Sequence, residues 1–294
     1  MTAASARETR EGGALEHDRR RDGALLLPGL GWLLVFFAAP LAIMFVVSFG
    51  QRDQYGGVYF SGASLEAYLR ALDPGFLPTV LNTIKYAAVT TVLSLIVAYP
   101  MAYFIARYGG RRKALLLVLV MLPFWTSWVI RTYAWMIVLR DNGVVNSVLE
   151  VVGLGPFQFM NTDFAVILGM TYGFLPFTIL PLYVAIDRLD PALVHAARDL
   201  YASGRQAFLH VTLPLTMPGV IAASILTFIP ALGDYVTPDL LGGAQTTTVA
   251  KVISTAFLSS RDWPFGAALG FLMIGFTIVG TVVGLRFLRR EVIG

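Results

Sequence analysis

The chain has 294 residues, of which 56% are hydrophobic and 14% are charged. This composition excludes an ordinary soluble domain, in which about 25% of the residues are charged, and indicates a protein that crosses a membrane several times. The formal net charge of +4 follows from the membrane topology described below and requires no nucleic-acid partner, and the absence of cysteine excludes disulfide bonds and thiol chemistry.

Residues 1–22 are polar and basic and show no apolar period. We predict that they form a disordered cytoplasmic tail. The pair Ala38-Ala39 resembles a signal-peptide cleavage site, but the uncharged run from Gly23 to Gln51 is too long for such a peptide. An uncleaved first helix is therefore expected.

Six apolar stretches are long enough to cross a membrane. At about 1.5 Å per residue, roughly 20 residues cross the hydrocarbon of about 30 Å. Helices are expected because lipid cannot hydrogen-bond to the backbone. We predict an all-α polytopic membrane protein whose six-helix domain covers residues 23–290, with spans at roughly 24–50, 80–106, 114–138, 164–186, 216–240 and 263–285.

The distribution of Lys and Arg orients these spans. With the N-terminus inside, most of the 22 basic residues fall on the cytoplasmic side. Because positive residues are enriched on that side, both termini are predicted to be cytoplasmic. The outer loops are then 51–79, 139–162 and 241–262, and the inner loops are 107–113 and 187–215.

The third span is rich in aromatic residues. Several of them share one helical face with Thr132 by their spacing: Trp125, Trp128 and Trp135. Together with Tyr133, they form either an aromatic belt at the lipid headgroups or part of a solute path.

Arg131 places a cation in the same span. A charge in hydrocarbon is costly unless it is paired or reaches water. We expect Arg131 to pair with Asp141 or Asp163, or to extend to the headgroups.

The inner loop after the fourth span predicts a short amphipathic helix. Asp190 can cap it, and Pro191 suits its first position. Small or apolar residues recur at helical spacing: Leu193, Ala196, Ala197 and Leu200. Adjacent alanines let another backbone come close, so this face is predicted to dock on a partner.

This loop resembles the Glu-Ala-Ala loop of permease subunits of binding-protein-dependent ABC importers. The matching positions are Ala196, Ala197, Val211, Leu213 and Pro214, whereas His195 replaces the family's Glu and Tyr201 its Gly. The resemblance implies a type I-like ABC importer permease whose coupling loop, 187–218, binds an ATPase subunit. The implied ATPase-coupling residues are Leu193, His195, Ala196, Ala197, Asp199, Leu200, Tyr201, Ala202, Gly204, Phe208, Leu213 and Pro214.

Two details of this loop are open to test. Tyr adopts a positive φ only with strain, so we expect Gly204 to supply the turn and the helix to continue to about Ser203. Phe208 is expected to face the ATPase, because a six-helix bundle of this size offers it no partner.

An acid lies in the predicted fifth span. Counted from Pro218, Asp234 lies about 24 Å along the helix, in the outer third of the hydrocarbon. A carboxylate at that depth is a candidate functional residue. Pro230 frees the Leu226 carbonyl nearby. Asp239 is expected at the outer surface, either solvated or in a substrate path.

From about residue 80 onward the chain closely resembles the permeases of spermidine/putrescine-type importers. The resemblance rests on residues 123–135, 141–146, 228–243 and 261–265. It implies a polyamine cargo, whose ammonium groups suit spaced carboxylates and aromatic rings. The candidate substrate-path residues are Asp234, Tyr235, Asp239, Trp125, Trp128, Tyr133 and Trp135. Similar sequences include permeases for phosphonates, opines, amino-acid derivatives, thiamine and iron(III), which stay open as alternative cargoes.

The resemblance also implies the partners: two ATP-binding subunits, a second related permease and a soluble solute-binding protein, at a bacterial inner membrane. We expect no enzyme activity and no cofactor in this chain, because it lacks the Gly-x-x-x-x-Gly-Lys phosphate loop and ATP would bind the partner subunit. No metal site is expected either, since the three His residues lack ligand spacing. The rival interpretation is a self-sufficient secondary transporter or channel, against which the coupling loop weighs.

Overall fold

The computed structural model describes residues 28–53, 55–60 and 62–293. The tail predicted at residues 1–22 therefore lies outside the described part. Within that part the chain is helical, apart from a small antiparallel hairpin in the first outer loop, β1 (Gln51–Arg52) and β2 (Val58–Tyr59). The predicted all-α class is confirmed.

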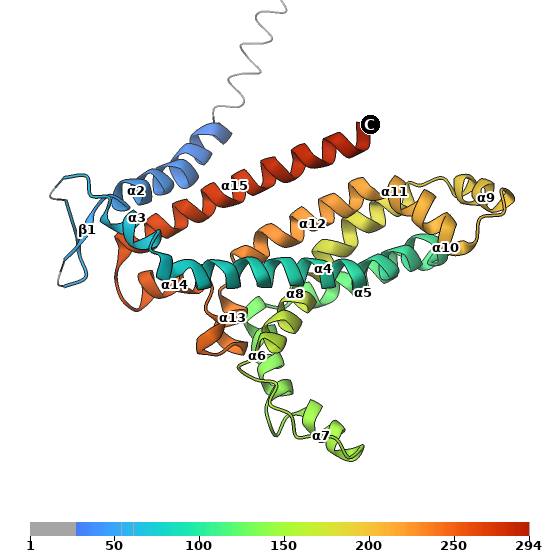
Figure 1. Ribbon diagram of the computed structural model, residues 1–294, viewed down its shortest axis with the longest axis horizontal. Coiled ribbons are helices and arrows are strands. Elements are labelled where there is room, and N and C mark those ends of the chain that lie inside the picture. Colours follow the sequence, from blue (N-terminus) through green and yellow to red (C-terminus); the bar gives the residue numbers. More distant parts are fainter. Residues whose placement is uncertain (1–27, 54, 61, 294) are drawn as a thin grey trace, which may run out of the picture.

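Three long helices form the core. They are α4 (Leu77–Tyr108), α8 (Asp163–Asp187) and α12 (Met217–Leu232), which pack along one another (Figure 1). Small buried side chains at the crossings let the backbones approach: Ala87, Ala98, Ala102 and Ala223. The hydroxyl groups of Thr178 and Thr227 hydrogen-bond across α8 and α12 at 2.8 Å, so neither is left unpaired in the core.

Not all of the predicted spans are straight helices. Within the described residues, four are single apolar helices: Pro28–Val47, Pro74–Tyr108, Asp163–Asp187 and Trp263–Val282. The other two are bent pairs. Gly110–Trp125 and Trp128–Val151 meet at 87°, and Gly204–Leu215 and Met217–Leu232 meet at 65°.

The predicted third span, 114–138, is wrong as a single helix. α5 (Lys113–Met121) ends in a 3₁₀ turn, and α6 (Trp128–Leu139) begins after two residues in an extended conformation. Pro123 lies at the start of the 3₁₀ turn. Its missing N–H and fixed φ permit this tighter turn, because one bond of the α-helix is already absent there.

The predicted fifth span, 216–240, is also wrong at its outer end. α12 stops at Leu232, and a separate short helix, α13 (Val236–Leu241), follows. Further short helices occupy the predicted loops: α3 (Glu66–Ala71), α7 (Val144–Val151), α9 (Pro191–Asp199), α10 (Gly204–Ala207), α11 (Leu213–Leu215) and α14 (Val249–Leu258).

The first outer loop and the coupling loop lie at opposite ends of the long axis, whereas the second outer loop with α7 projects sideways from the middle (Figure 1). Figure 1 shows α9 at one end and the β hairpin and α3 at the other, with α14 on the side of the hairpin. The helices α2 (Ala39–Val47) and α15 (Trp263–Ile293) pack on each other through Phe45 and Phe271, whose rings meet edge-on at 5.2 Å. An apolar cavity of about 650 Å³ lies between α15 and the core helices α4 and α12.

The crossing of α12 over α8 gives a test of the core. A Cβ at Gly219 would overlap the Cβ of Ala185 and lie 3.1 Å from the Pro181 carbonyl oxygen. We expect Gly219→Ala to force the helices apart and to lower the free energy of unfolding by about 1–3 kcal/mol. The measurement is the thermal unfolding midpoint in detergent. Gly275→Ala is the matched control, because no atom lies within 4 Å of its added Cβ. An equal loss in both variants would contradict the close crossing.

Candidate functional site

The inner loop forms the helix that the sequence predicts. The Asp190 carboxylate accepts a hydrogen bond from the Ala192 N–H at 2.9 Å, and Pro191 occupies the first position of α9. Arg107 donates to the Leu189 carbonyl at 2.8 Å. This bond ties the start of the loop to the end of α4.

Large apolar side chains on α9 and directly after it are uncovered. Leu193 is 46% exposed, Leu200 82% and Tyr201 97%, and α9 projects beyond the core helices in Figure 1. Exposed apolar groups gathered in this way mark a surface that another molecule covers. Of the predicted coupling residues, the exposed ones are Leu193, His195, Ala196, Asp199, Leu200, Tyr201, Gly204 and Pro214, and the half-buried ones are Ala197, Ala202, Phe208 and Leu213.

The predicted position of the turn is wrong. α9 ends at Asp199 and does not reach Ser203, and Tyr201 itself takes the left-handed conformation, with φ +64°. Gly204 is the first residue of α10. The reason is a capping box: the Ser203 side chain accepts from the Gln206 N–H, and the Gln206 side chain accepts from the Ser203 N–H. It starts a new helix at Gly204, so the turn falls on Tyr201.

The expectation for Phe208 is also wrong. Its ring packs edge-on against Tyr99 of α4, with centroids 5.5 Å apart. The Tyr99 hydroxyl in turn hydrogen-bonds the Thr216 hydroxyl at 2.7 Å. Phe208 therefore anchors the coupling loop to its own core, and the surface open to a partner lies on α9 and Tyr201.

His195 borders a cavity of about 450 Å³ between α9 and the ends of α4, α5 and α8. The cavity is also lined by Arg107 and Arg198 and by Lys113 and Asp187, which form an ion pair at 2.5 Å. His195 thus shares this cavity with three basic residues and one acid.

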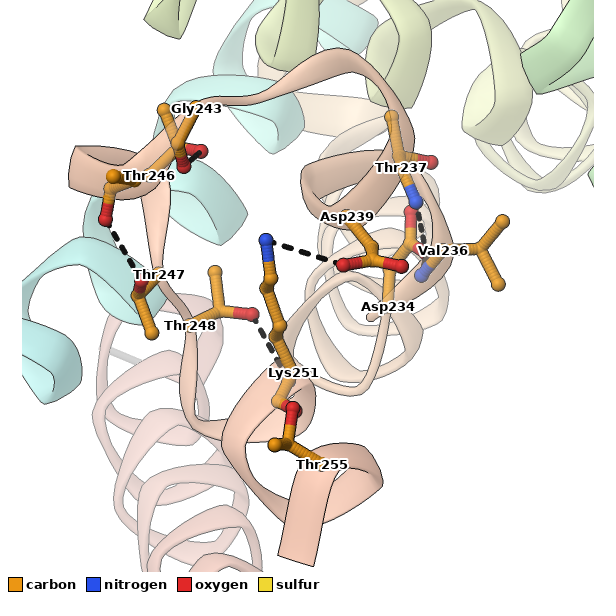
Figure 2. Close-up of polar contacts among 11 residues, drawn as sticks. Asp234, Val236, Thr237, Asp239, Gly243, Thr246, Thr247, Thr248, Lys251 and Thr255 are labelled. Atoms are coloured by element: carbon orange, nitrogen blue, oxygen red, sulfur yellow. Dashed lines mark hydrogen bonds and ion pairs between the residues drawn. The ribbon is translucent and has the colours of Figure 1, made fainter. Parts of the chain in front are cut away.

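At the outer end of the core, Asp234 follows α12 and does not lie within it. One carboxylate oxygen, Oδ1, accepts from the N–H groups of Val236 and Thr237 at 3.0 and 3.2 Å (Figure 2). It thereby pairs donors that the start of α13 leaves free. Asp234 is 9% exposed, and its other oxygen, Oδ2, has no hydrogen-bond partner among the described residues. Such a buried atom is suited to accept a hydrogen bond or a cation from a bound molecule.

Trp128 braces this site. Its indole N–H donates to the Thr237 hydroxyl at 3.2 Å, and its ring packs against Phe174 with centroids 4.9 Å apart. The side chain therefore joins α6, α8 and α13. Trp128 and Asp234 therefore both hydrogen-bond Thr237, Trp128 at its hydroxyl and Asp234 at its backbone N–H.

The predicted aromatic face is divided by the bend after α5. Trp125 precedes the bend and is 77% exposed, whereas Trp128 and Trp135 follow it. Trp135 packs edge-on against Tyr172 at 5.5 Å, and Tyr133 is 45% exposed. Of the four predicted aromatic path residues, Trp128 is the one that the described structure hydrogen-bonds to α13.

Asp239 forms an ion pair that the sequence reasoning missed. Its Oδ1 lies 3.1 Å from the Lys251 Nζ, and Figure 2 shows this lysine extending from α14. Tyr235 directly precedes α13 and lies four residues before Asp239; its side chain is 44% exposed. The sequence does carry a sign that Lys251 is unusual. It is the one charged residue between 241 and 260. It also lies in a predicted outer loop, although positive residues are enriched in inner loops.

The expected ion pairs of Arg131 are wrong. Its guanidinium lies over the rings of Trp128 and Phe124, at 5.1 and 5.7 Å from their centroids, and lines a cavity of about 590 Å³. Asp163 pairs instead with Lys85 at 2.7 Å. The faces of the two rings stabilise the cation in place of a carboxylate.

Comparison with known proteins agrees with this architecture. Residues 94–291 match the family described as "Binding-protein-dependent transport system inner membrane component". The chain is 41% identical over 250 residues to "Spermidine/putrescine transport system permease protein PotB" of Haemophilus influenzae, covering 84% of this chain and 86% of that protein. It is 36% identical over 233 residues to "Inner membrane ABC transporter permease protein YdcU" of Escherichia coli, covering 74% of each.

A solved structure has the same fold. One chain in the crystal structure of a bacterial alginate ABC transporter, in complex with its alginate-bound periplasmic protein, superposes with a TM-score of 0.73 at 22% identity. The match covers 94% of this chain and 97% of that one. The predicted family is confirmed: the chain belongs to the inner-membrane components of binding-protein-dependent transport systems.

Proposed function

We propose that this chain is a permease subunit of an ATP-driven importer and that its cargo is a polyamine of the spermidine or putrescine class. The similarity to a spermidine/putrescine permease extends over most of the chain and supports this cargo. The structural observation that carries the proposal is the buried Asp234, whose Oδ2 has no partner among the described residues. A polyamine ammonium supplies the donor and the positive charge that this oxygen lacks.

The chain works with two ATP-binding subunits and a second, related permease. The uncovered face of α9 and Tyr201 docks on an ATPase subunit. Closure of the two ATPase subunits draws the coupling helices together, and Phe208 transmits this movement to α4 through its contact with Tyr99. The pore then opens outward to receive cargo, and ATP hydrolysis resets it.

Primary selectivity belongs to the soluble binding protein, and Asp234 and its neighbours form a low-affinity passage site. Several features suit passage better than retention. Asp239 and Tyr235 are about half exposed, so water competes for any ligand there. A transporter must release its cargo, and weak binding on the path keeps that release fast.

The alternative cargoes differ in charge. A phosphonate is repelled by an unpaired buried carboxylate, so Asp234 disfavours anions among the candidate solutes. Thiamine and amino-acid derivatives that carry a positive charge remain the second choice. A self-sufficient secondary transporter is disfavoured, because the chain belongs to a family whose members work with a binding protein.

The charge of Asp234 can be separated from its cap. An Asn side chain still accepts the Val236 and Thr237 N–H groups but carries no charge. We expect Asp234→Asn to lower polyamine uptake into proteoliposomes at least tenfold, which is about 1.4 kcal/mol of lost interaction, and to leave the unfolding midpoint and the affinity of the binding protein unchanged.

Asp234→Leu removes the cap as well, and should also cost about 1 kcal/mol of stability. Asp73→Asn is the matched control, because Asp73 is an exposed acid that caps a short 3₁₀ helix through the Gly75 N–H at 2.7 Å. Uptake by Asp234→Asn at the parental rate would show that the carboxylate has a structural role only.

Tyr201 tests the docking surface. Tyr201→Gly relieves a left-handed residue and should stabilise the chain by about 1 kcal/mol, yet it removes the most exposed ring of the surface. We expect solute-stimulated ATP hydrolysis by the assembled importer to fall roughly thirtyfold, since aromatic side chains buried at interfaces contribute about 2 kcal/mol and each 1.4 kcal/mol is about a factor of ten.

Tyr201→Phe keeps the ring and should couple normally. Gly204→Val should also be tolerated, because no atom lies within 4 Å of a Cβ at Gly204. Normal coupling by Tyr201→Gly would remove Tyr201 from the docking surface.

A further inference from the structure

Lys251 and Asp239 join two neighbouring outer helices. The Lys251 Nζ lies 3.1 Å from the Asp239 Oδ1, and the side chains of Lys251 and Asp239 are 25% and 54% exposed (Figure 2). Lys251 is the third residue of α14, whose N-terminus is capped by the Thr248 hydroxyl. A helix N-terminus carries a partial positive charge, so a lysine there is unfavourable unless an acid compensates it. Asp239 is that acid.

The backbone fixes the geometry of this pair. α13 and α14 are joined by a tight turn in which a Cβ at Gly242 would overlap the Thr246 hydroxyl and lie 2.6 Å from the Pro238 carbonyl oxygen. The Thr246 hydroxyl donates to the Gly243 carbonyl at 2.8 Å (Figure 2). The turn directs α14 back toward α13, so the ammonium group is held at the carboxylate by the fold as well as by its charge.

The chemistry of the pair matches that of the proposed cargo. A lysine side chain is a four-carbon chain that ends in a primary ammonium, and putrescine is a four-carbon chain with such a group at each end. The Asp239 carboxylate on α13 and the half-exposed ring of Tyr235, which caps that helix, lie four residues apart and offer an anion and an aromatic face. An ammonium that binds the Asp239 Oδ1 competes with the lysine ammonium 3.1 Å from it.

We propose that Lys251 is a tethered competitor of the cargo: it occupies Asp239 when the path is empty, and an ammonium group of the polyamine displaces it during passage. This inference rests on the proposed function, since it requires a cationic cargo. An exposed ion pair adds little net stability, so the exchange costs little. Once displaced, the lysine ammonium stays close because its side chain is attached to α14. It can therefore bind Asp239 again and displace the cargo. Lys251 thus keeps the affinity of the passage site low.

The test is the binding of radiolabelled putrescine to the assembled importer in nanodiscs, without its binding protein. Lys251→Met keeps the length of the side chain and removes its charge. We expect it to bind putrescine roughly tenfold more tightly than the parental importer, because the competing charge is gone, and to turn over more slowly in uptake with the binding protein present. Lys251→Arg keeps the charge and grips a carboxylate with two parallel hydrogen bonds, so it should bind putrescine more weakly than the parent.

Lys85→Met is the matched control, because Lys85 forms a similar outer ion pair with Asp163 at 2.7 Å. It should not raise the affinity. Asp239→Asn in the Lys251→Met background should abolish the gain. If Lys251→Met binds no more tightly than the parent, or if Lys85→Met gives an equal gain, the competitor role is overturned and the pair is a structural link. Failure of the parental importer to take up putrescine or spermidine with its binding protein would instead overturn the proposed function, and this inference with it.

Discussion

A helix that starts in the protein interior has backbone N–H groups that need acceptors, and the buried carboxylate of Asp234 is such an acceptor between α12 and α13. Its Oδ1 accepts two N–H groups of α13. The new helix can then begin in a new direction, where Trp128 reaches Thr237 and Asp239 reaches Lys251. The oxygen that remains, Oδ2, is buried and has no hydrogen-bond partner among the described residues. Structure and candidate function therefore share a single carboxylate.

The existence of the spans follows from the sequence, but their bends do not. Length and apolarity are local properties, and they locate Pro74–Tyr108 and Asp163–Asp187 well. Proline is less informative. Pro100 and Pro176 lie inside continuous helices, whereas Pro123 begins a break of 87°. All three lack the same N–H, so the difference comes from how neighbouring helices pack, which the sequence of one segment does not contain.

The candidate site divides in the same way. The α9 helix and its cap could be predicted because Asp190 and Pro191 act on adjacent residues. The turn after it was misplaced, although the spacing of Ser203 and Gln206 carries the signal of a helix start at Gly204. The pairing of Lys251 with Asp239 depends on the path of the backbone through Gly242 and Gly243. The stacking of Arg131 on Trp128 depends on the bend before α6. Contacts of this kind require the fold.

The contact between α2 and α15 has a consequence for biosynthesis. Phe45 lies on the first described span and packs against Phe271 on the last. The core helices α4, α8 and α12 can assemble while translation continues, but α2 gains this neighbour after α15 has been made. During most of synthesis its apolar surface is therefore held by lipid or by the insertion machinery. Translation that terminates before residue 263 would release a chain that contains all three core helices but lacks α15, the partner of its first helix.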